Sequence, residues 1–222
     1  MGRRVPDAQR GTDPRRVTDG GAPAPAVPEA QLSDGWERVD SSVETLFELD
    51  RAGIRVQGHT LVYEDRPLRE AVRATTDGQV NQTWRFFFAT RLTFEPPLPT
   101  GVGLQMVLPA VRSEARRHFV DDLRARGFES IEQGRREKLR TRGGTTVRLQ
   151  QVSGSFTPPT VEGPLPIEGW VGVWSDGGLY VAGGAYPATP LTESFAGDDA
   201  ILDRDPGTYR DELYRVLRGV GD

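Results

Sequence analysis

Histidine and cysteine, which most often supply nucleophiles, general bases and metal ligands, are scarce in this chain of 222 residues. Cysteine is absent, which excludes disulfides, thiolate catalysis, iron–sulfur clusters and cysteine-ligated zinc. The two histidines, His59 and His118, fall in a predicted strand and a predicted helix, and neither has a second histidine at zinc-motif spacing. Glu114 lies four residues before His118, a spacing that predicts a pair on one helix face. We therefore predict no metal site and assign both histidines to structural or surface positions.

Motifs for nucleophilic or nucleotide chemistry are also missing. The chain has no G-x-S-x-G sequence and no P-loop lysine. Gly101 and Gly103 begin a dinucleotide pattern, but Met106 occupies the third glycine position and no βαβ unit surrounds it. No spacing favours a serine nucleophile, and 32 acidic residues leave any catalytic carboxylate pair unconstrained. We predict no cofactor and lean against an enzyme, with an unrecognised hydrolase left open.

Basic residues gather in the middle of the chain, within residues 109–150. That span holds six acidic residues and eleven basic ones, namely Arg112, Arg116, Arg117, Arg124, Arg126, Arg135, Arg136, Lys138, Arg140, Arg142 and Arg148. Residues 151–222 instead hold four basic and eleven acidic residues. Because guanidinium groups pair bidentately with carboxylates and phosphates, one interpretation is an anion-binding or partner-docking surface over residues 112–148. The other is an ordinary solvated helix face and hairpin.

Within this span we take Arg116, Arg135, Arg136, Arg140 and Arg142 as the candidate residues for an anion or a protein partner. The net charge of −4 and the interleaved acids argue against nucleic acid. Self-association is a further alternative, with the basic middle of one molecule against the acidic end of another.

Composition also bears on the host and the compartment. A single lysine among 28 basic residues fits a GC-rich genome, and a salt-loving host would suppress lysine too. No apolar run approaches the ~20 residues of a membrane span. The first 16 residues are followed by no apolar segment of the kind found in signal peptides. We therefore predict a cytoplasmic protein without a membrane span.

The chain divides at about residue 33. Residues 1–33 are rich in Pro, Gly, Ala, Arg and Asp without periodicity, which predicts a disordered N-terminal tail. Residues 34–222 show alternating and helical hydrophobic patterns throughout. They predict a single α+β domain.

The most apolar stretch, residues 83–97, is predicted to be a strand with one aromatic face. Its two-residue period places Trp84, Phe86, Phe88, Leu92 and Phe94 together, and Pro96 and Pro97 end the pairing. Three hairpins are predicted around it, over residues 43–64, 131–156 and 170–186. A turn at residues 50–53 closes the first of them.

Three helices are predicted, over residues 65–76, from Pro109 to Gly127, and from Pro206 to Gly219. A short strand at residues 103–108 precedes the second helix. Because hairpins provide most connections, we predict one mainly antiparallel, twisted sheet of about six to eight strands. Two to three helices are expected to pack on its aromatic face.

Several short motifs together resemble an uncharacterised haloarchaeal domain family. They are Phe94-Glu95-Pro96, the long helix ending at Gly127, the paired hairpins, Ala185-Tyr186-Pro187, and Arg218-Gly219-Val220. The likeness covers residues 36–220 in outline and implies no catalytic residue. The layout is also similar to PsbP-type sheets with helices on both sides, which implies docking rather than catalysis.

The function favoured by these observations is a non-enzymatic docking domain that uses the arginine-rich span. The alternative is a small-ligand-binding domain with an aromatic cavity. Its lining would be Trp84, Phe86, Phe88, Trp170, Trp174 and Tyr180, which a filled aromatic core would equally explain.

Overall fold

The computed structural model describes residues 22–33, 35–49, 53–158, 161, 163–195 and 199–222. The strands are β1 (Trp36–Leu49), β2 (Ile54–Asp65), β3 (Phe86–Glu95), β4 (Glu129–Arg140), β5 (Thr146–Phe156), β6 (Leu165–Ser175) and β7 (Leu179–Pro187). The helices are α1 (Glu29–Leu32), α2 (Arg66–Thr75), α3 (Leu104–Ala125) and α4 (Pro206–Arg218), with a short 3-10 helix at Leu191–Glu193.

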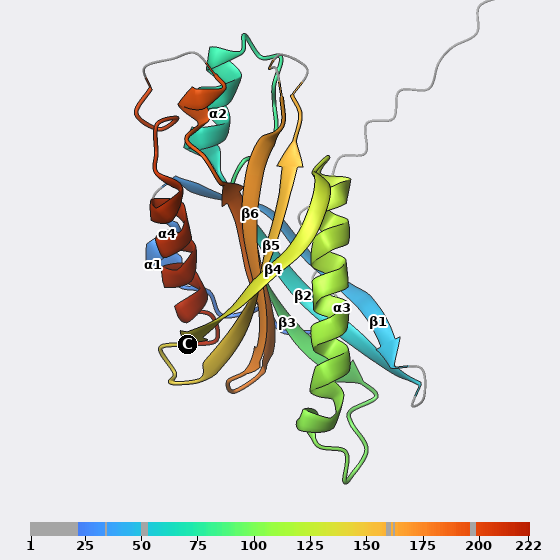
Figure 1. Ribbon diagram of the computed structural model, residues 1–222. Coiled ribbons are helices and arrows are strands. Elements are labelled where there is room, and N and C mark those ends of the chain that lie inside the picture. The colour runs from blue at the N-terminus through green and yellow to red at the C-terminus, as the bar shows by residue number, and fades with distance from the viewer. Residues whose placement is uncertain (1–21, 34, 50–52, 159–160, 162, 196–198) are drawn as a thin grey trace, which may run out of the picture.

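All seven strands form one antiparallel sheet in the order β1-β2-β3-β7-β6-β5-β4. Helix α3 lies on one face of the sheet, and α1, α2 and α4 lie on the other (Figure 1). The predicted fold class is therefore confirmed. The described residues hold four α-helices rather than two to three, because the single-turn α1 lies ahead of the predicted domain.

The predicted aromatic face of β3 is confirmed for Phe86, Phe88, Leu92 and Phe94, which lie on the side of α3, but the strand is also buried on its other face. Phe86 and Phe87 are 1% and 0% exposed, and they belong to different core clusters. Phe86 packs with α3 residues such as Phe119, whereas Phe87 packs with residues on the side of α4. Trp84 precedes the strand and lies in the cluster of Phe87, since pairing with β7 begins only at Phe86.

Helices α2 and α4 begin as predicted, at side-chain caps followed by proline. Asp65 accepts a hydrogen bond from the Leu68 N–H at 3.1 Å, and Asp205 accepts one from the Thr208 N–H at 3.3 Å. Such caps satisfy N–H groups that have no partner within the helix.

Helix α3 begins at Leu104, so the strand predicted at residues 103–108 is wrong. Leu104 and Leu108 are one turn apart and extend the buried stripe of Val111 and Ala115. Pro109 lies inside the helix, where its missing N–H removes one helical hydrogen bond near the N-terminal end. Burial of the two leucines outweighs that loss.

The described part of the predicted tail, residues 22–33, packs against the domain. Ala22 and Leu32 are each 5% exposed, and the Ala22 carbonyl accepts a hydrogen bond from His59 Nδ1 at 3.0 Å. The Gly221 N–H donates to the Ala26 carbonyl at 3.1 Å. The packed part of the chain therefore begins before residue 34. The tail prediction for residues 1–21, and that of a turn at residues 50–52, lie outside the described residues.

Close backbone approach at Gly184 gives a stability prediction. A Cβ at this position would lie 2.3 Å from the Phe86 carbonyl oxygen and 3.0 Å from Leu213 Cδ1 of α4. Gly184→Ala should therefore lower the free energy of unfolding, measured by urea denaturation, by about 1–3 kcal/mol. Gly103→Ser is the matched control, because a Cβ there meets nothing within 4 Å. Equal stability of the two variants would contradict this account of the sheet centre.

Candidate functional site

Four arginines from three elements line one hollow on the α3 face of the sheet. Arg112 and Arg116 are one turn apart on α3, and Arg136 and Arg148 lie on β4 and β5. The hollow has a volume of about 160 Å³ and is floored by the β6 residues 171–173. We call this feature, defined by the four arginines, the arginine hollow.

Strand alternation on β4 decides which of the predicted arginines reach this hollow. Leu139 is buried in the core beneath α4, and Glu137 accepts a hydrogen bond from Tyr214 of α4 at 2.9 Å. Odd-numbered residues at this end of β4 therefore face α4, and even-numbered residues face the side of α3. Arg136 falls on the side of α3, and Arg135 falls on the opposite face.

The structure therefore brings only Arg116 and Arg136 of the five predicted candidates together in the hollow. Arg135 instead bonds Glu137 at 2.8 Å, and its guanidinium carbon lies 5.7 Å from the centre of the Trp170 ring. Arg140 and Arg142 lie at the β4–β5 turn and do not line the hollow. Arg112 and Arg148 join the set. Helix spacing places Arg112 beside Arg116, but only the packing of α3 on the sheet brings Arg112 and Arg148 to the same hollow.

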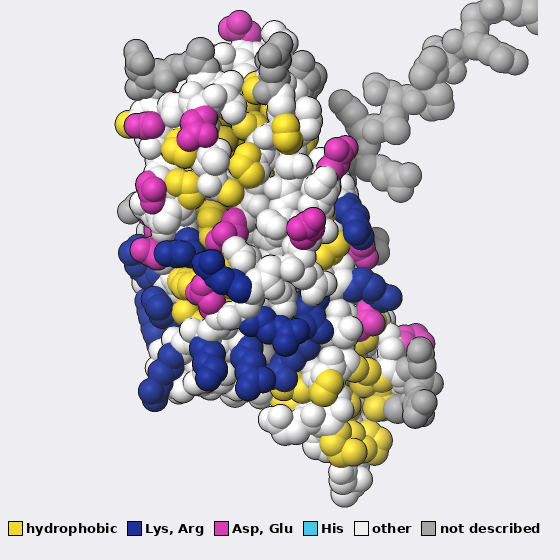
Figure 2. Space-filling model, viewed as in Figure 1, with side chains coloured by type: hydrophobic (Ala, Val, Ile, Leu, Met, Phe, Trp, Pro, Cys, Tyr) yellow, Lys and Arg dark blue, Asp and Glu magenta, His cyan; other side chains and the backbone are white. Residues whose placement is uncertain are grey.

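Ion pairing separates the arginine hollow from only part of the basic span, because Lys138, Arg140 and Arg142 also have no carboxylate partner among the described residues. Three neighbouring arginines on α3 pair with acids of the same helix: Arg117 with Glu114, Arg124 with Asp121, and Arg126 with Asp122. Within the described ranges, the four arginines of the hollow have no carboxylate partner. Figure 2 shows a band of basic side chains across this face of the molecule.

The pairing of β4 with β5 places two positive charges opposite each other beside the hollow. Lys138 of β4 is directly opposite Arg148 of β5. Like charges in directly opposed positions destabilise a sheet unless an anion neutralises them. Arg136 keeps one internal partner, because its Nε donates to Gln150 Oε1 at 3.0 Å.

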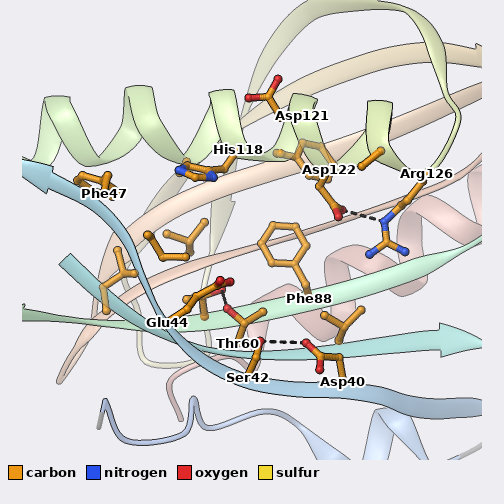
Figure 3. A pocket seen from close by; sticks show the side chains of 18 of the residues that line it. Asp40, Ser42, Glu44, Phe47, Thr60, Phe88, His118, Asp121, Asp122 and Arg126 are labelled. Atoms are coloured by element: carbon orange, nitrogen blue, oxygen red, sulfur yellow. Dashed lines mark hydrogen bonds and ion pairs between the residues drawn. The ribbon is translucent and has the colours of Figure 1, made fainter. Parts of the chain in front are cut away.

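A larger cleft of about 510 Å³ lies on the other side of α3, between that helix and strands β1, β2 and β3. Figure 3 shows His118, Asp121, Asp122 and Arg126 on α3, with Asp40, Ser42 and Glu44 across from them on β1. Apolar side chains form its interior, namely Leu46, Phe47, Val62, Phe88, Leu92, Val111, Phe119 and Val181.

The predicted aromatic cavity is filled. Five of its six residues are buried at 3% exposure or less: Trp84, Phe86, Trp170, Trp174 and Tyr180. Only Phe88 lines the cleft. The aromatic residues therefore form core, and the open volume lies where α3 and β1 stand apart.

On the opposite face, Arg85 is a buried cation directly before the first residue of β3. Its side chain is 3% exposed and bonds Asp65 at 2.9 Å and Glu212 at 2.7 Å. The guanidinium carbon lies 4.5 Å from the Trp36 ring centre and 4.9 Å from that of Tyr209. Because every contact is internal and satisfied, we assign this Arg85 network to stability. A charged residue inside an aromatic run was the only signal for it.

A second polar network lies between α4 and the sheet. Glu168 accepts hydrogen bonds from Trp170 Nε1 at 2.9 Å, Gln151 Nε2 at 2.7 Å and the Tyr186 hydroxyl. Burial, aided by the neighbouring carboxylates Glu168 and Glu137, raises the pKa of Tyr186 and Tyr214 well above the ordinary value. Burial also raises the pKa of Tyr209 to about 12. These phenols therefore stay protonated and serve as hydrogen-bond donors.

The remaining chemistry-bearing residues do not converge. His59 contacts Ser41 Oγ at 3.2 Å and the Ala22 carbonyl, and His118 is exposed. The described residues contain no group of three or more His, Cys, Asp and Glu side chains arranged for a metal ion.

In that same part of the chain, no helix has the length and apolar character required to cross a bilayer.

Family comparison covers nearly the whole described fold. A family model described as Domain of unknown function (DUF6517) matches residues 24–221. The chain belongs to this family. The match includes both core clusters, the cleft and the arginine hollow, and it starts within the region that the sequence assigned to a tail. Comparison of this DUF6517 chain with curated proteins and with solved structures finds no match.

The Arg85 network predicts a large effect of removing one partner. Arg85→Met leaves Asp65 and Glu212 with less neutralising charge in a largely buried position. The free energy of unfolding should fall by about 3–5 kcal/mol in urea denaturation. Arg66→Met is the control, since Arg66 is exposed and its ion pairs are 3.9 Å long. A loss no larger than that of the control would show that the network adds no stability.

The buried tyrosines predict alkaline destabilisation. Between pH 10 and about 12 the unfolded chain releases protons that folded Tyr186, Tyr209 and Tyr214 retain. Their contribution is complete below pH 10, and the free energy of unfolding should fall as pH rises from there through about 12. Ultraviolet titration should show four of the five tyrosines ionising later in the folded protein than in urea, because burial raises the pKa of Tyr63 as well as those of these three. Titration of all five near pH 10 in both states would contradict this.

Proposed function

We propose that this chain is a non-enzymatic interaction domain that docks an acidic segment of a partner protein at Arg112, Arg116, Arg136 and Arg148. The observation that carries the proposal is the convergence of four guanidinium groups, none with a carboxylate partner among the described residues, on one hollow.

The chemistry of the hollow suits carboxylates. Each guanidinium offers a planar fork of donors that matches a carboxylate in a bidentate pair. The hollow has a volume of about 160 Å³, and one water molecule occupies ~30 Å³ in the liquid. The hollow therefore has room for an acidic side chain. Helix α3 and strands β4 and β5 fix the backbone positions of the arginines, so only their side chains become ordered on binding.

Docking is favoured over hydrolysis by the lining itself. The residues around the hollow include no serine, histidine or carboxylate that would act as nucleophile or base. A protein partner is favoured over nucleic acid because the net charge is −4 and acids of α3 neutralise its neighbouring arginines. The cytoplasmic location, the salt-loving archaeal host and the likeness to PsbP-type sheets stay predictions within this proposal.

A charge reversal tests the docking site with a short oligo-glutamate peptide as the probe. Arg116→Glu combined with Arg136→Glu should weaken peptide binding by at least about tenfold, because charge-assisted hydrogen bonds contribute about 1.5–3 kcal/mol each. Isothermal titration calorimetry gives the affinity, and circular dichroism checks that the variant is folded. Affinity for the unchanged protein should also fall as salt is raised.

The matched control is Arg140→Glu combined with Arg142→Glu, which changes net charge equally at exposed arginines outside the hollow. This control should keep most of the binding. If both double variants lose peptide affinity equally, the binding depends only on overall charge. If neither loses affinity, the arginine hollow is not the binding site. Tighter binding of a DNA duplex than of the peptide would replace the protein partner by nucleic acid.

A further inference from the structure

The cleft between α3 and strands β1 to β3 is shaped by specific features of β1. Two β-bulges interrupt the pairing of β1 with β2, one between Arg38 and Asp40 and one between Thr45 and Phe47. Each bulge adds one residue, so that two successive side chains reach the cleft, Val39 with Asp40 and Leu46 with Phe47. Between the bulges, the even-numbered residues line it.

Other elements also leave the cleft open. Gly58 of β2 lies beneath Leu46, and a Cβ there would approach Leu46 Cδ1 to 2.6 Å. Helix α3 presents the small residues Ala115 and Ala125 to the cleft. Phe88 stays half-buried, whereas its neighbours Phe86 and Phe87 are 1% and 0% exposed. The cavity therefore results from residue choices on all its walls.

The interior of the cleft offers apolar surface with its polar groups already satisfied. Thr60 and Thr90, on the strands that form the floor, hydrogen-bond one another through their hydroxyls at 2.9 Å. Phe88 and Phe119 lie with ring centres 5.6 Å apart, between the sheet and α3. A bound molecule would thus bury an apolar body here without breaking hydrogen bonds.

The rim carries an excess of negative charge. Asp121 and Asp122 on the helix side pair with Arg124 and Arg126 at 3.0 and 2.8 Å. Across the cleft, Asp40 accepts a hydrogen bond from Ser42 at 2.9 Å, and the described residues provide no cationic partner for Asp40 or Glu44. Figure 3 shows both of these carboxylates on β1 opposite the helix. The β1 side of the rim is therefore a negative wall above an apolar floor.

We propose that this cleft binds a small amphipathic organic cation, with its apolar body over Phe88 and Leu46 and its charged group beside Asp40 and Glu44. Two carboxylates without a cationic partner among the described residues select positive charge. This site is separate from the arginine hollow, because the two lie on opposite flanks of α3. Each proposal therefore stands or fails without the other.

Calorimetric titration of the full-length protein with decyltrimethylammonium, below its micelle concentration, tests the charge preference. We expect saturable binding of one cation per chain and weaker binding of decyl sulfate, which has the same chain and opposite charge. Tighter or equal binding of decyl sulfate, or no saturable binding of the cation, overturns the proposal.

Two single substitutions on β1 form a matched pair. Glu44→Gln removes a carboxylate from the rim, whereas Glu48→Gln removes one four residues later on the other side of the bulge, outside the cleft lining. Glu44→Gln should weaken cation binding by about threefold to fivefold, and Glu48→Gln should leave it unchanged. Equal effects of the two variants contradict the assigned position of the charged group.

Filling the cleft separates binding inside it from binding on the surface. Ala125→Trp adds a large ring at an exposed position of the lining, where the core is not overpacked. This variant should keep its circular dichroism spectrum and lose cation binding by at least tenfold. Retained binding overturns the proposal. The unchanged protein could instead form a concentration-dependent dimer in gel filtration that Ala125→Trp abolishes while cation affinity is kept. That result would make the cleft an interface between two copies.

Discussion

One helix covers one face of a seven-stranded sheet, and the two candidate sites follow from that constraint. Neighbouring strands are ~4.8 Å apart, so the sheet is roughly 30 Å wide, whereas a helix with its side chains is only ~10–12 Å across. Helix α3 therefore covers only part of this face, where it packs most closely on β6, and leaves open sheet on each flank. The cleft with an apolar floor lies over β1, β2 and β3, and the arginine hollow lies beside the helix over β4, β5 and β6.

Charge on α3 follows this division. Arg112 and Arg116 face the arginine hollow, while His118, Asp121, Asp122 and Arg126 face the cleft. Between the two sets runs the buried stripe that ends at Leu123. Pairing within α3 neutralises Asp121 and Asp122, so the uncompensated negative charge beside the cleft lies on β1, at Asp40 and Glu44, and the uncompensated positive charge lies at the arginine hollow. An anion and an organic cation would consequently find separate sites on a single helix.

The opposite face is built for rigidity. Helices α1, α2 and α4 cover it together, and the Arg85 network joins the start of α2 to α4 through Asp65 and Glu212. Glu168 and Glu137 are bonded by tyrosines between α4 and the sheet. Such satisfied polar contacts specify one arrangement of α4, because any other arrangement would leave buried charges or hydroxyls unpaired. Stable strands beneath α4 in turn hold the arginines of β4 and β5 in place.

The sequence by itself determined the local elements. Alternation and helical periodicity located the three hairpins and three longer helices, and Pro206, Gly127 and Gly219 marked helix ends. These signals depend only on neighbours within a few residues. Part of the arginine hollow was predictable in the same way, since Arg116 and Arg136 lie in an obviously basic span. Only the tertiary structure decided that β3 pairs with β7, that Arg112 and Arg148 meet them, that Arg135 faces away, and that β1 bulges around a cleft. Those outcomes depend on register and on packing between segments far apart in the chain, and local periodicity carries no record of either.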